Sequence, residues 1–322
     1  MDPRYDVVTV GRAGVDIYPL EVGVGLEHVG TFGKFLGGTA ANVAVAAARH
    51  GLRAALVSRT GDDPFGRFVH AALRDLGVDD RYVTPVADLP TPVTFCEIFP
   101  PDDFPLYFYR RPAAPDMQLT PESLPAELVS GARLFWTIGS ALSEEPSRSA
   151  MLSAYAARGR EPLTVLDLDY RPMFWPDRAA ATEQLAAALE QVTVAVGNLD
   201  ECYTAVGERD PHRAAAALLE RGLDLAVVKQ GPRGVLAATR DEVVEVPPIP
   251  VEVVNGLGAG DAFGGGLCVG LLGGWPLFDT VRFANAAGAI VASRLECSTA
   301  MPTTSEVEAA VADAARGETV GA

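Results

Sequence analysis

"NGLGAGDAFGGG" (Asn255–Gly266) contains six glycines and a single charged residue, Asp261. An apolar, β-branched run, EVVEVPPIPVEVV, precedes it, and an uncharged run, AFGGGLCVGLLGG, follows Asp261. This context predicts a strand, a glycine-rich turn and the start of a buried helix. Glycines allow a ligand to approach the backbone closely, and the free amides of a helix N-terminus attract anions. The segment therefore predicts a phosphate-binding turn formed by Gly258, Ala259 and Gly260.

Asp261 needs an explanation of its own, because a carboxylate beside an anion site repels a resting phosphate. As a general base, it would accept the proton of an attacking hydroxyl while the amides hold the charge of the transferred phosphoryl group. Alternatively, it is a helix-capping carboxylate favoured by the helix dipole. The spacing does not decide between these two roles. The sequence contains no GxxxxGK[ST] motif, so a Walker P-loop is excluded.

Short apolar runs alternate with helical patterns along most of the 322 residues. Strands are predicted to begin near Tyr5, Ala54, Ala132, Leu163, Val192 and Asp224. Helices are predicted over Thr39–Gly51, Pro64–Gly77, PHRAAAALLERG and PLFDTVRFANAAGAIVASRL. Apolar strands that alternate with helices are typical of a parallel sheet covered on both faces. The predicted fold class is α/β, doubly wound with a mostly parallel sheet, in a single domain over residues 1–322.

Two segments interrupt this alternation, at about residues 15–38 and 90–112. The first is rich in glycine with alternating apolar residues, and the second reads as a hairpin whose turn contains PPDD. Both predict inserted β-strands that form a small lid over a cleft at the strand ends. The alternative is a pair of surface hairpins without a role in a site.

Composition narrows the class of function. The formal net charge of −16 argues against a nucleic-acid partner, because phosphate backbones require clustered Lys and Arg. No apolar run reaches the roughly 20 residues that span a membrane. The four cysteines are far apart and form no CxxC pair, which predicts free, buried thiols and a cytoplasmic protein. The exposed edge of the lid suggests a homodimer.

Two motifs resemble those of a known family. GGTAANVAVAAARHG (residues 37–51) and NGLGAGDAFGGGL (residues 255–267) are similar to the two signatures of the ribokinase-type (PfkB) sugar kinases. The resemblance extends over essentially the whole chain. It implies a doubly wound α/β domain with a β lid that transfers the terminal phosphoryl group of ATP to a sugar hydroxyl.

The resemblance also implies roles for individual residues. Asp261 would be the base, with Gly258, Ala259 and Gly260 as the anion hole. Glu201, in the element GNLDE, would hold Mg²⁺ through water together with Asn198. The remaining residues of the nucleotide site would be Lys229, Gly231, Gly234, Asn255 and Asn285. The sugar pocket would contain Asp16, Gly37, Gly38 and Asn42.

One departure from the family concerns a monovalent cation. Many members have Asp-Thr-Thr before Gly-Ala-Gly-Asp, and that Asp and the second Thr help to bind K⁺. This chain has Asn255-Gly256-Leu257 there. The loss of the negative charge argues against K⁺ as a cofactor.

Arginines indicate the substrate class. LYFYRR places Tyr109 and Arg110 at the end of a lid strand, and VLDLDYRP places Arg171 just past a central strand. Guanidinium groups are suited to a carboxylate, so we expect these residues to bind a sugar acid. FPLYFYR, DYRPMFW and VVNGLGAGDAFGGG look most like the family members that phosphorylate 5-dehydro-2-deoxygluconate in inositol catabolism. Alternatives are 2-keto-3-deoxygluconate, a neutral sugar such as fructose or ribose, a nucleoside, and a non-catalytic sugar or nucleotide sensor.

Overall fold

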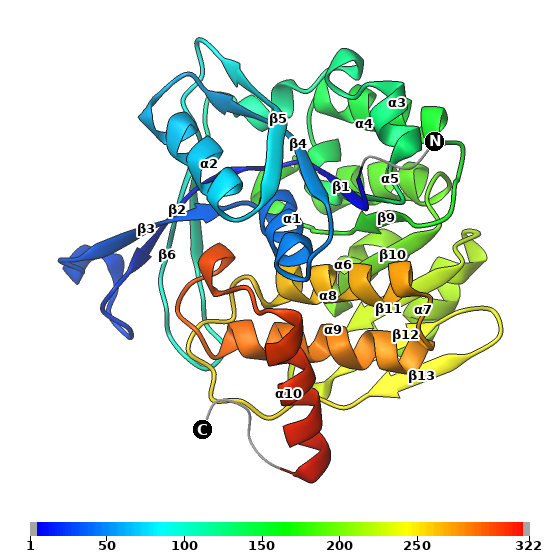
Figure 1. The fold of residues 1–322 in the computed structure, drawn as a ribbon. Helices are drawn as coiled ribbons and strands as arrows, with labels where there is room; N and C mark the ends of the chain where they lie inside the picture. The colour runs from blue at the N-terminus through cyan, green and yellow to red at the C-terminus, as the bar shows by residue number, and fades with distance from the viewer. Residues whose placement is uncertain (1–4, 318–322) are drawn as a thin grey trace.

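A nine-stranded sheet forms the centre of the computed structural model, which describes residues 5–317 (Figure 1). In spatial order its strands are β13 (Val243–Val246), β12 (Val235–Ala238), β11 (Leu225–Lys229), β10 (Val194–Asn198), β9 (Thr164–Asp167), β8 (Leu134–Ile138), β1 (Val7–Val10), β4 (Ala54–Gly61) and β5 (Val78–Val86). Neighbours are parallel from β11 to β5, and β12 runs antiparallel to both of its neighbours. The predicted α/β fold and the strands β1, β4, β8, β9, β10 and β11 are thus confirmed, whereas β5 and β12 were not predicted. The strand predicted just before the glycine-rich turn is present only as β13, at the start of that run, and does not extend to the turn.

The strand order reverses at β1. From β1 the chain continues outward to β4 and β5 on one side, and it later returns to β8 and continues through β11 on the other side. In doubly wound sheets, ligands bind beyond the carboxyl ends of the strands at such a switch point. The crevice between the ends of β1 and β8 is therefore the expected place for a site.

Helices cover both faces of the sheet (Figure 1). They are α1 (Thr39–Arg49), α2 (Pro64–Asp75), α3 (Ala126–Gly131), α4 (Ser147–Arg158), α5 (Arg178–Leu189), α6 (Leu199–Val206), α7 (Pro211–Glu220), α8 (Ala259–Gly273), α9 (Leu277–Ala292) and α10 (Thr304–Arg316). The helices predicted near residues 39, 64, 211 and 277 are all present, and α8 begins within the predicted glycine-rich turn.

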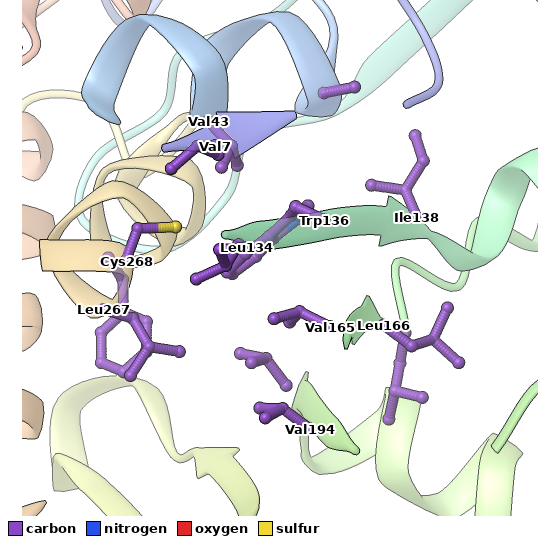
Figure 2. Packing of buried hydrophobic residues seen from close by; sticks show 14 of the residues in the cluster. Val7, Val43, Leu134, Trp136, Ile138, Val165, Leu166, Val194, Leu267 and Cys268 are labelled. Carbon is purple, nitrogen blue, oxygen red and sulfur yellow. The ribbon is translucent and has the colours of Figure 1, made fainter. Parts of the chain in front are cut away.

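Strand β8 shows how the two helical layers meet the sheet (Figure 2). Trp136 is fully buried and packs toward Val43 of α1 and Gly264 of α8. The next residue, Thr137, points to the opposite face, where its hydroxyl lies 2.7 Å from the hydroxyl of Tyr155 in α4. Side chains that alternate between two buried faces require a continuous apolar strand, which is the pattern in the sequence.

A second, four-stranded sheet projects from the side of the main body (Figure 1). Its spatial order is β3 (Phe32–Gly37), β2 (Gly14–Pro19), β6 (Val93–Cys96) and β7 (Leu106–Tyr109). The β6–β7 pair is an antiparallel hairpin, as predicted. These strands come from the two predicted insertions, and we refer to them as the lid. Because Asp16, Thr94 and Phe108 of the lid line a cavity next to the main sheet, the lid is not a pair of surface hairpins.

The four cysteines are free thiols and all are buried, in agreement with the sequence-based prediction. Across residues 5–317, none of the helices has both the length and the apolar content needed to cross a bilayer.

Candidate active site

The start of helix α8 has little room for side chains. Gly258, the residue before the helix, has a φ of 80°, which glycine adopts without strain. A Cβ at this position would lie 2.6 Å from the sulfur of Cys297, so a larger residue does not fit. A Cβ at Gly260 would lie 3.3 Å from the ammonium of Lys229. Free amides at a helix N-terminus with a cation beside them form an anion-binding arrangement.

Asp261 lies in the first turn of α8, and its carboxylate is held from another helix. Asn42 Nδ2 of α1 donates a 2.7 Å hydrogen bond to Asp261 Oδ2. Ser298 Oγ donates to Asn42 Oδ1 at 2.5 Å and so orients the amide. No side chain in residues 5–317 caps this helix, whose N-cap residue is Gly258. Because Asp261 lies in the first turn of α8, where the helix dipole favours a carboxylate, both roles stay predictions.

The environment of Asp261 changes its acidity. Burial raises the pKa of Asp261 to about 6, although the hydrogen bond from Asn42 acts in the opposite direction. The nearby charge of Asp169 also raises this pKa, whereas Lys229 and Arg171 lower it. A carboxyl group of this kind is ionised at neutral pH yet binds a proton more strongly than an ordinary Asp. Those are the properties required of a general base.

A small cavity of about 50 Å³ begins at the Asp261 carboxylate. It is lined by six residues predicted from the sequence: Asp16, Gly38, Asn42, Arg171, Gly258 and Asp261. It is also lined by residues that sequence reasoning missed: Arg12, Tyr18, Thr39, Thr94, Leu106, Phe108, Leu257 and Cys297. Gly37 has an indirect role, because a Cβ there would collide with the carboxylate of Asp16. The lid, α1 and α8 thus each contribute one wall.

Asp16 places a second carboxylate in the small cavity. The hydroxyl of Tyr18 donates a 3.0 Å hydrogen bond to Asp16 Oδ2 and lies 2.8 Å from the sulfur of Cys297. Burial raises the pKa of Asp16, and the charge of Arg12 opposes that effect. Hydrogen-bond acceptors of this kind are suited to the hydroxyl groups of a sugar.

Charged groups gather behind the start of α8, at the carboxyl ends of β9 and β11: Asp167 and Asp169 are buried, and Arg171 and Lys229 are partly buried. Arg171 Nη2 lies 3.0 Å from Asp169 Oδ1, and this carboxylate raises the pKa of Arg171. Burial raises the pKa of Asp167 to about 7. Burial disfavours the charged form of Lys229, but the negative charges of Asp167 and Glu201 have the larger effect and raise the pKa of Lys229. Sequence reasoning missed both aspartates, although their alternation in VLDLDYRP places them together at the end of a strand.

A larger cavity of about 670 Å³ lies on the other side of the glycine-rich turn. It is lined by six residues predicted for the nucleotide: Lys229, Gly231, Gly234, Ala259, Gly260 and Asn285. The rest of its wall is mainly apolar and includes Pro248, Ile249, Pro250, Val251, Val253, Phe263, Ala289 and Ala292. An apolar wall with cationic and amide groups at one end is suited to a ligand with a flat apolar part and an anionic tail. The turn itself therefore separates two cavities of different chemistry.

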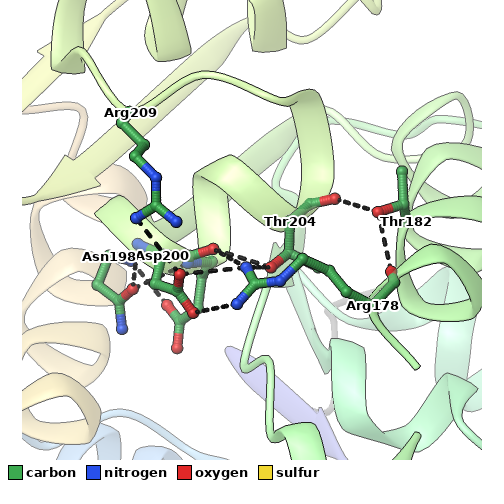
Figure 3. A network of polar contacts seen from close by, with 7 residues as sticks. Arg178, Thr182, Asn198, Asp200, Thr204 and Arg209 are labelled. Carbon is green, nitrogen blue, oxygen red and sulfur yellow. Dashed lines mark hydrogen bonds and ion pairs between the residues drawn. The ribbon is translucent and has the colours of Figure 1, made fainter. Parts of the chain in front are cut away.

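Asn198 and Glu201 form the start of α6 and are not among the residues that line either cavity. Asn198 Oδ1 accepts hydrogen bonds from the amides of Asp200 and Glu201, and the Asn198 amide donates to Glu201 Oε2 at 2.7 Å. Asp200 in turn pairs with Arg178 of α5 (Figure 3). Glu201 is buried, however, and its charge acts on Lys229. Residues 5–317 contain no group of three or more His, Cys, Asp and Glu side chains arranged to hold a metal, so a role toward Mg²⁺ stays a prediction.

Asn255 was predicted to contact the nucleotide, but it is fully buried beneath the turn. Its Nδ2 donates a 2.7 Å hydrogen bond to the Leu295 carbonyl, and its Oδ1 accepts one of 3.0 Å from the Leu257 amide. Asn255 therefore connects the glycine-rich turn to the segment after α9 and has a structural role in this conformation.

Tyr109 and Arg110 were predicted to bind the sugar, and the structure does not bring them to Asp261. They line another cavity, of about 410 Å³, which shares Leu106 and Phe108 of β7 with the small cavity. Arg110 Nη2 forms a buried ion pair of 3.0 Å with Asp116, and the guanidinium stacks on Phe174. Tyr109 is 67% exposed. The charge of Arg110 is already balanced, which explains why this arginine is not available to the cavity of Asp261.

Comparison with known proteins agrees with this geometry. The 5-dehydro-2-deoxygluconokinase of Listeria monocytogenes serotype 4b (strain CLIP80459) is 32% identical over 317 residues, which are 97% of this chain and 97% of that protein. The 5-dehydro-2-deoxygluconokinase of Bacillus subtilis (strain 168) is 30% identical over 313 residues, covering 95% of this chain and 96% of the relative. The crystal structure of a fructokinase from Vibrio cholerae O395 with fructose, ADP and calcium superposes with a TM-score of 0.84 at 27% identity, covering 96% of this chain and 100% of that one.

The family comparison covers almost all of the chain as well. Residues 4–304 match the pfkB family carbohydrate kinases. Both signature segments, 37–51 and 255–267, lie within the matched range and meet at the hydrogen bond between Asn42 and Asp261. The chain therefore belongs to the pfkB family of carbohydrate kinases and is a sugar kinase.

Proposed function

We propose that this kinase transfers the terminal phosphoryl group of ATP to the terminal hydroxyl of 5-dehydro-2-deoxygluconate. The observation that carries the proposal is the position of the α8 start between two cavities. Gly258 and Asp261 line the small cavity, whereas Ala259 and Gly260 line the large one. A hydroxyl in the small cavity and a phosphate tail in the large one would therefore meet at this turn.

Each residue at the turn has a role in that transfer. Asp261 accepts the proton of the attacking hydroxyl, and Asn42 keeps its carboxylate directed into the small cavity. The amides of Ala259 and Gly260 hold the charge of the migrating phosphoryl group, as does the ammonium of Lys229 beside them. These groups are fixed before substrate arrives, so little reorganisation is needed during the reaction.

The volume of the large cavity, about 670 Å³, and the chemistry of its wall support ATP as its ligand. The apolar wall takes the base, and Asn285 lies along that wall with its Nδ2 bonded to the Pro247 carbonyl. Mg²⁺, when bound with ATP, balances phosphate charge. The buried carboxylates of Asp167 and Glu201 beside Lys229 would supply the hard oxygen donors that this ion prefers, directly or through water.

The choice of a sugar acid rests on Arg171 and on the named relatives. Arg171 lines the small cavity and carries a charge suited to a carboxylate. The two relatives at 32% and 30% identity are both named 5-dehydro-2-deoxygluconokinase. The fructokinase at 27% identity makes a neutral sugar the main alternative, and 2-keto-3-deoxygluconate is the closest acid alternative.

The test is a measurement of ADP release with 5-dehydro-2-deoxygluconate, 2-keto-3-deoxygluconate, fructose, ribose and adenosine. We expect the highest kcat/KM with the first of these; a higher value with fructose or ribose would overturn the choice of acceptor. Asp261→Asn should reduce kcat by roughly 10²- to 10⁴-fold while ATP binding is preserved. Asp241→Asn, the same substitution at an exposed turn, serves as the control. Near-normal turnover of Asp261→Asn would remove the base assignment.

A further inference from the structure

The small cavity contains a buried cation that the roles above do not use. Arg12 follows strand β1 after a single glycine, is only 8% exposed and lines the cavity together with Asp261. Strand β1 is where the strand order of the main sheet reverses. Arg12 therefore lies at the switch point, where doubly wound sheets bind their ligands.

The guanidinium of Arg12 has few partners for a buried charge. Its Nη2 lies 3.4 Å from Thr39 Oγ1, and the group stands 5.2 Å from the centre of the Phe108 ring. Its Nε is buried and has no hydrogen-bond partner within residues 5–317. A guanidinium has five N–H donors, so most of its hydrogen-bonding capacity is available to a ligand.

Arg12 differs from the other arginines near the lid in its ion pairing, although the Nε of Arg171 is also buried without a hydrogen-bond partner in residues 5–317. Arg171 is paired with Asp169 at 3.0 Å and Arg110 with Asp116 at 3.0 Å. No ion pair joins Arg12 to a carboxylate in the described part of the chain. Asp16 is the nearest candidate by its electrostatic effect, but its Oδ2 accepts the hydroxyl of Tyr18. Arg12 and Asp16 attract each other without forming an ion pair in residues 5–317, so an anionic ligand would give the buried guanidinium a direct partner.

The backbone around Arg12 adds to the preference for an anion. Gly38, with a φ of 105°, is the N-cap residue of α1, and no side chain of residues 5–317 caps this helix. A Cβ at Gly38 would collide with the Arg12 carbonyl, so the glycine allows the loop after β1 to pack against the helix start. Gly38 and Thr39 both line the small cavity. The positive end of the α1 dipole therefore lies beside the guanidinium.

We propose that Arg12 binds the carboxylate of the acceptor through two N–H donors and thereby determines the preference for a sugar acid over a neutral sugar. This inference rests on the proposed function and names the residue that recognises the acid. Arg12 and Asp261 line the same cavity, so the carboxylate at Arg12 and the terminal hydroxyl at Asp261 would belong to one bound acid. Arg171, already paired with Asp169, contributes less to the discrimination.

The first part of the test uses the unaltered enzyme. KM and kcat are measured for 5-dehydro-2-deoxygluconate, its carboxamide, fructose and fructose 6-phosphate. We expect the free acid to have the lowest KM and the carboxamide a much higher one. A preference for fructose would overturn both the proposed acceptor and this inference, and a preference for fructose 6-phosphate would replace the carboxylate by a phosphate as the anion. This comparison does not depend on the folding of any variant.

The second part compares Arg12→Met, Arg12→Lys and Arg171→Met, with Arg240→Met at an exposed turn as the control. Arg12→Met should raise the KM for the acid by at least about 30-fold, because it removes one member of a buried charge pair. Its kcat and its KM for the carboxamide should change little, since the lost contact is the same in the ground and transition states. The KM of Arg12→Lys for the acid should lie between those of the unaltered enzyme and Arg12→Met, because lysine keeps the charge but lacks the planar guanidinium.

The outcomes separate the two proposals. If the unaltered enzyme prefers the acid and Arg12→Met keeps that preference, the acceptor stands and the role of Arg12 is refuted. If Arg171→Met alone removes the preference, recognition belongs to Arg171. Melting curves of each variant exclude loss of folding as the cause.

Discussion

The environment of Asp261 predicts how the activity depends on pH. Burial raises the pKa of Asp261 to about 6, and a general base works only in its ionised form. A group with this pKa is about 90% ionised at pH 7 and about 10% ionised at pH 5. We therefore expect kcat/KM to fall roughly tenfold between these two pH values. An Asp with the ordinary pKa of 3.8 would produce almost no change over that range.

The hydrogen bond from Asn42 provides a way to move this titration. That bond lowers the pKa of Asp261 by favouring the charged form. A hydrogen bond to a charged group contributes roughly 1.5–3 kcal/mol, and one pKa unit corresponds to about 1.36 kcal/mol. Asn42→Ala should therefore move the acidic limb of the profile upward by about one to two pH units. Asn42 also lines the small cavity, so the maximal kcat/KM of Asn42→Ala will fall as well. The pH at which the acidic limb lies does not depend on that maximum.

The assay is ADP release at limiting sugar concentration, because the pH dependence of kcat/KM reports the pKa values of groups in the free enzyme. Asp167 is the competing origin of the limb, because burial raises the pKa of its carboxyl group to about 7. Asp167→Asn should leave the limb near pH 6 in place. If Asp167→Asn removes the limb and Asn42→Ala leaves it unmoved, the reasoning about Asp261 is refuted.

Three further predictions concern single residues. Gly258→Ala should lower the free energy of unfolding by at least roughly 1–2 kcal/mol in a denaturant titration, because alanine is strained at positive φ and Cys297 occupies the space; unchanged stability would contradict this. Replacing K⁺ by Na⁺ should leave kcat/KM unchanged, because the turn is held by the uncharged amide of Asn255; strong activation by K⁺ would show otherwise. Burial lowers the pKa of His50 from 6.5 to about 4 in the folded protein. As the pH drops through this range, the imidazole is protonated in the unfolded chain before it is protonated in the folded one. The free energy of unfolding should therefore fall by up to roughly 3 kcal/mol. His50→Gln should flatten that part of the stability curve, and a variant as acid-sensitive as the parent would refute the assignment.

The central strands and helices could be predicted from the sequence because their patterns are local. Buried strands such as β8 and β10 are continuous apolar runs, and helices such as α2 end at glycines with positive φ. The strands that were missed or misplaced lie toward the two ends of the sheet: β5 is one edge strand, and β12 and β13 are the last two strands at the other end. Strands β5 and β13 are partly exposed and carry polar residues, so their sequences lack the continuous apolar pattern of a central strand.

The glycine-rich turn at the start of a buried helix and the single charge at Asp261 were also predicted from local sequence, since glycine content and one charged residue in a short segment are sufficient to indicate them. The charge state and partners of the site were decided only by tertiary structure. Asn42 and Asp261 are 219 positions apart, yet a hydrogen bond from the Asn42 amide holds the Asp261 carboxylate. The same holds for the arginines: Asp116 balances Arg110, whereas no carboxylate pairs with Arg12 among residues 5–317. Electrostatic energies depend on burial and on distances between side chains, and for segments far apart in the chain the fold alone determines both.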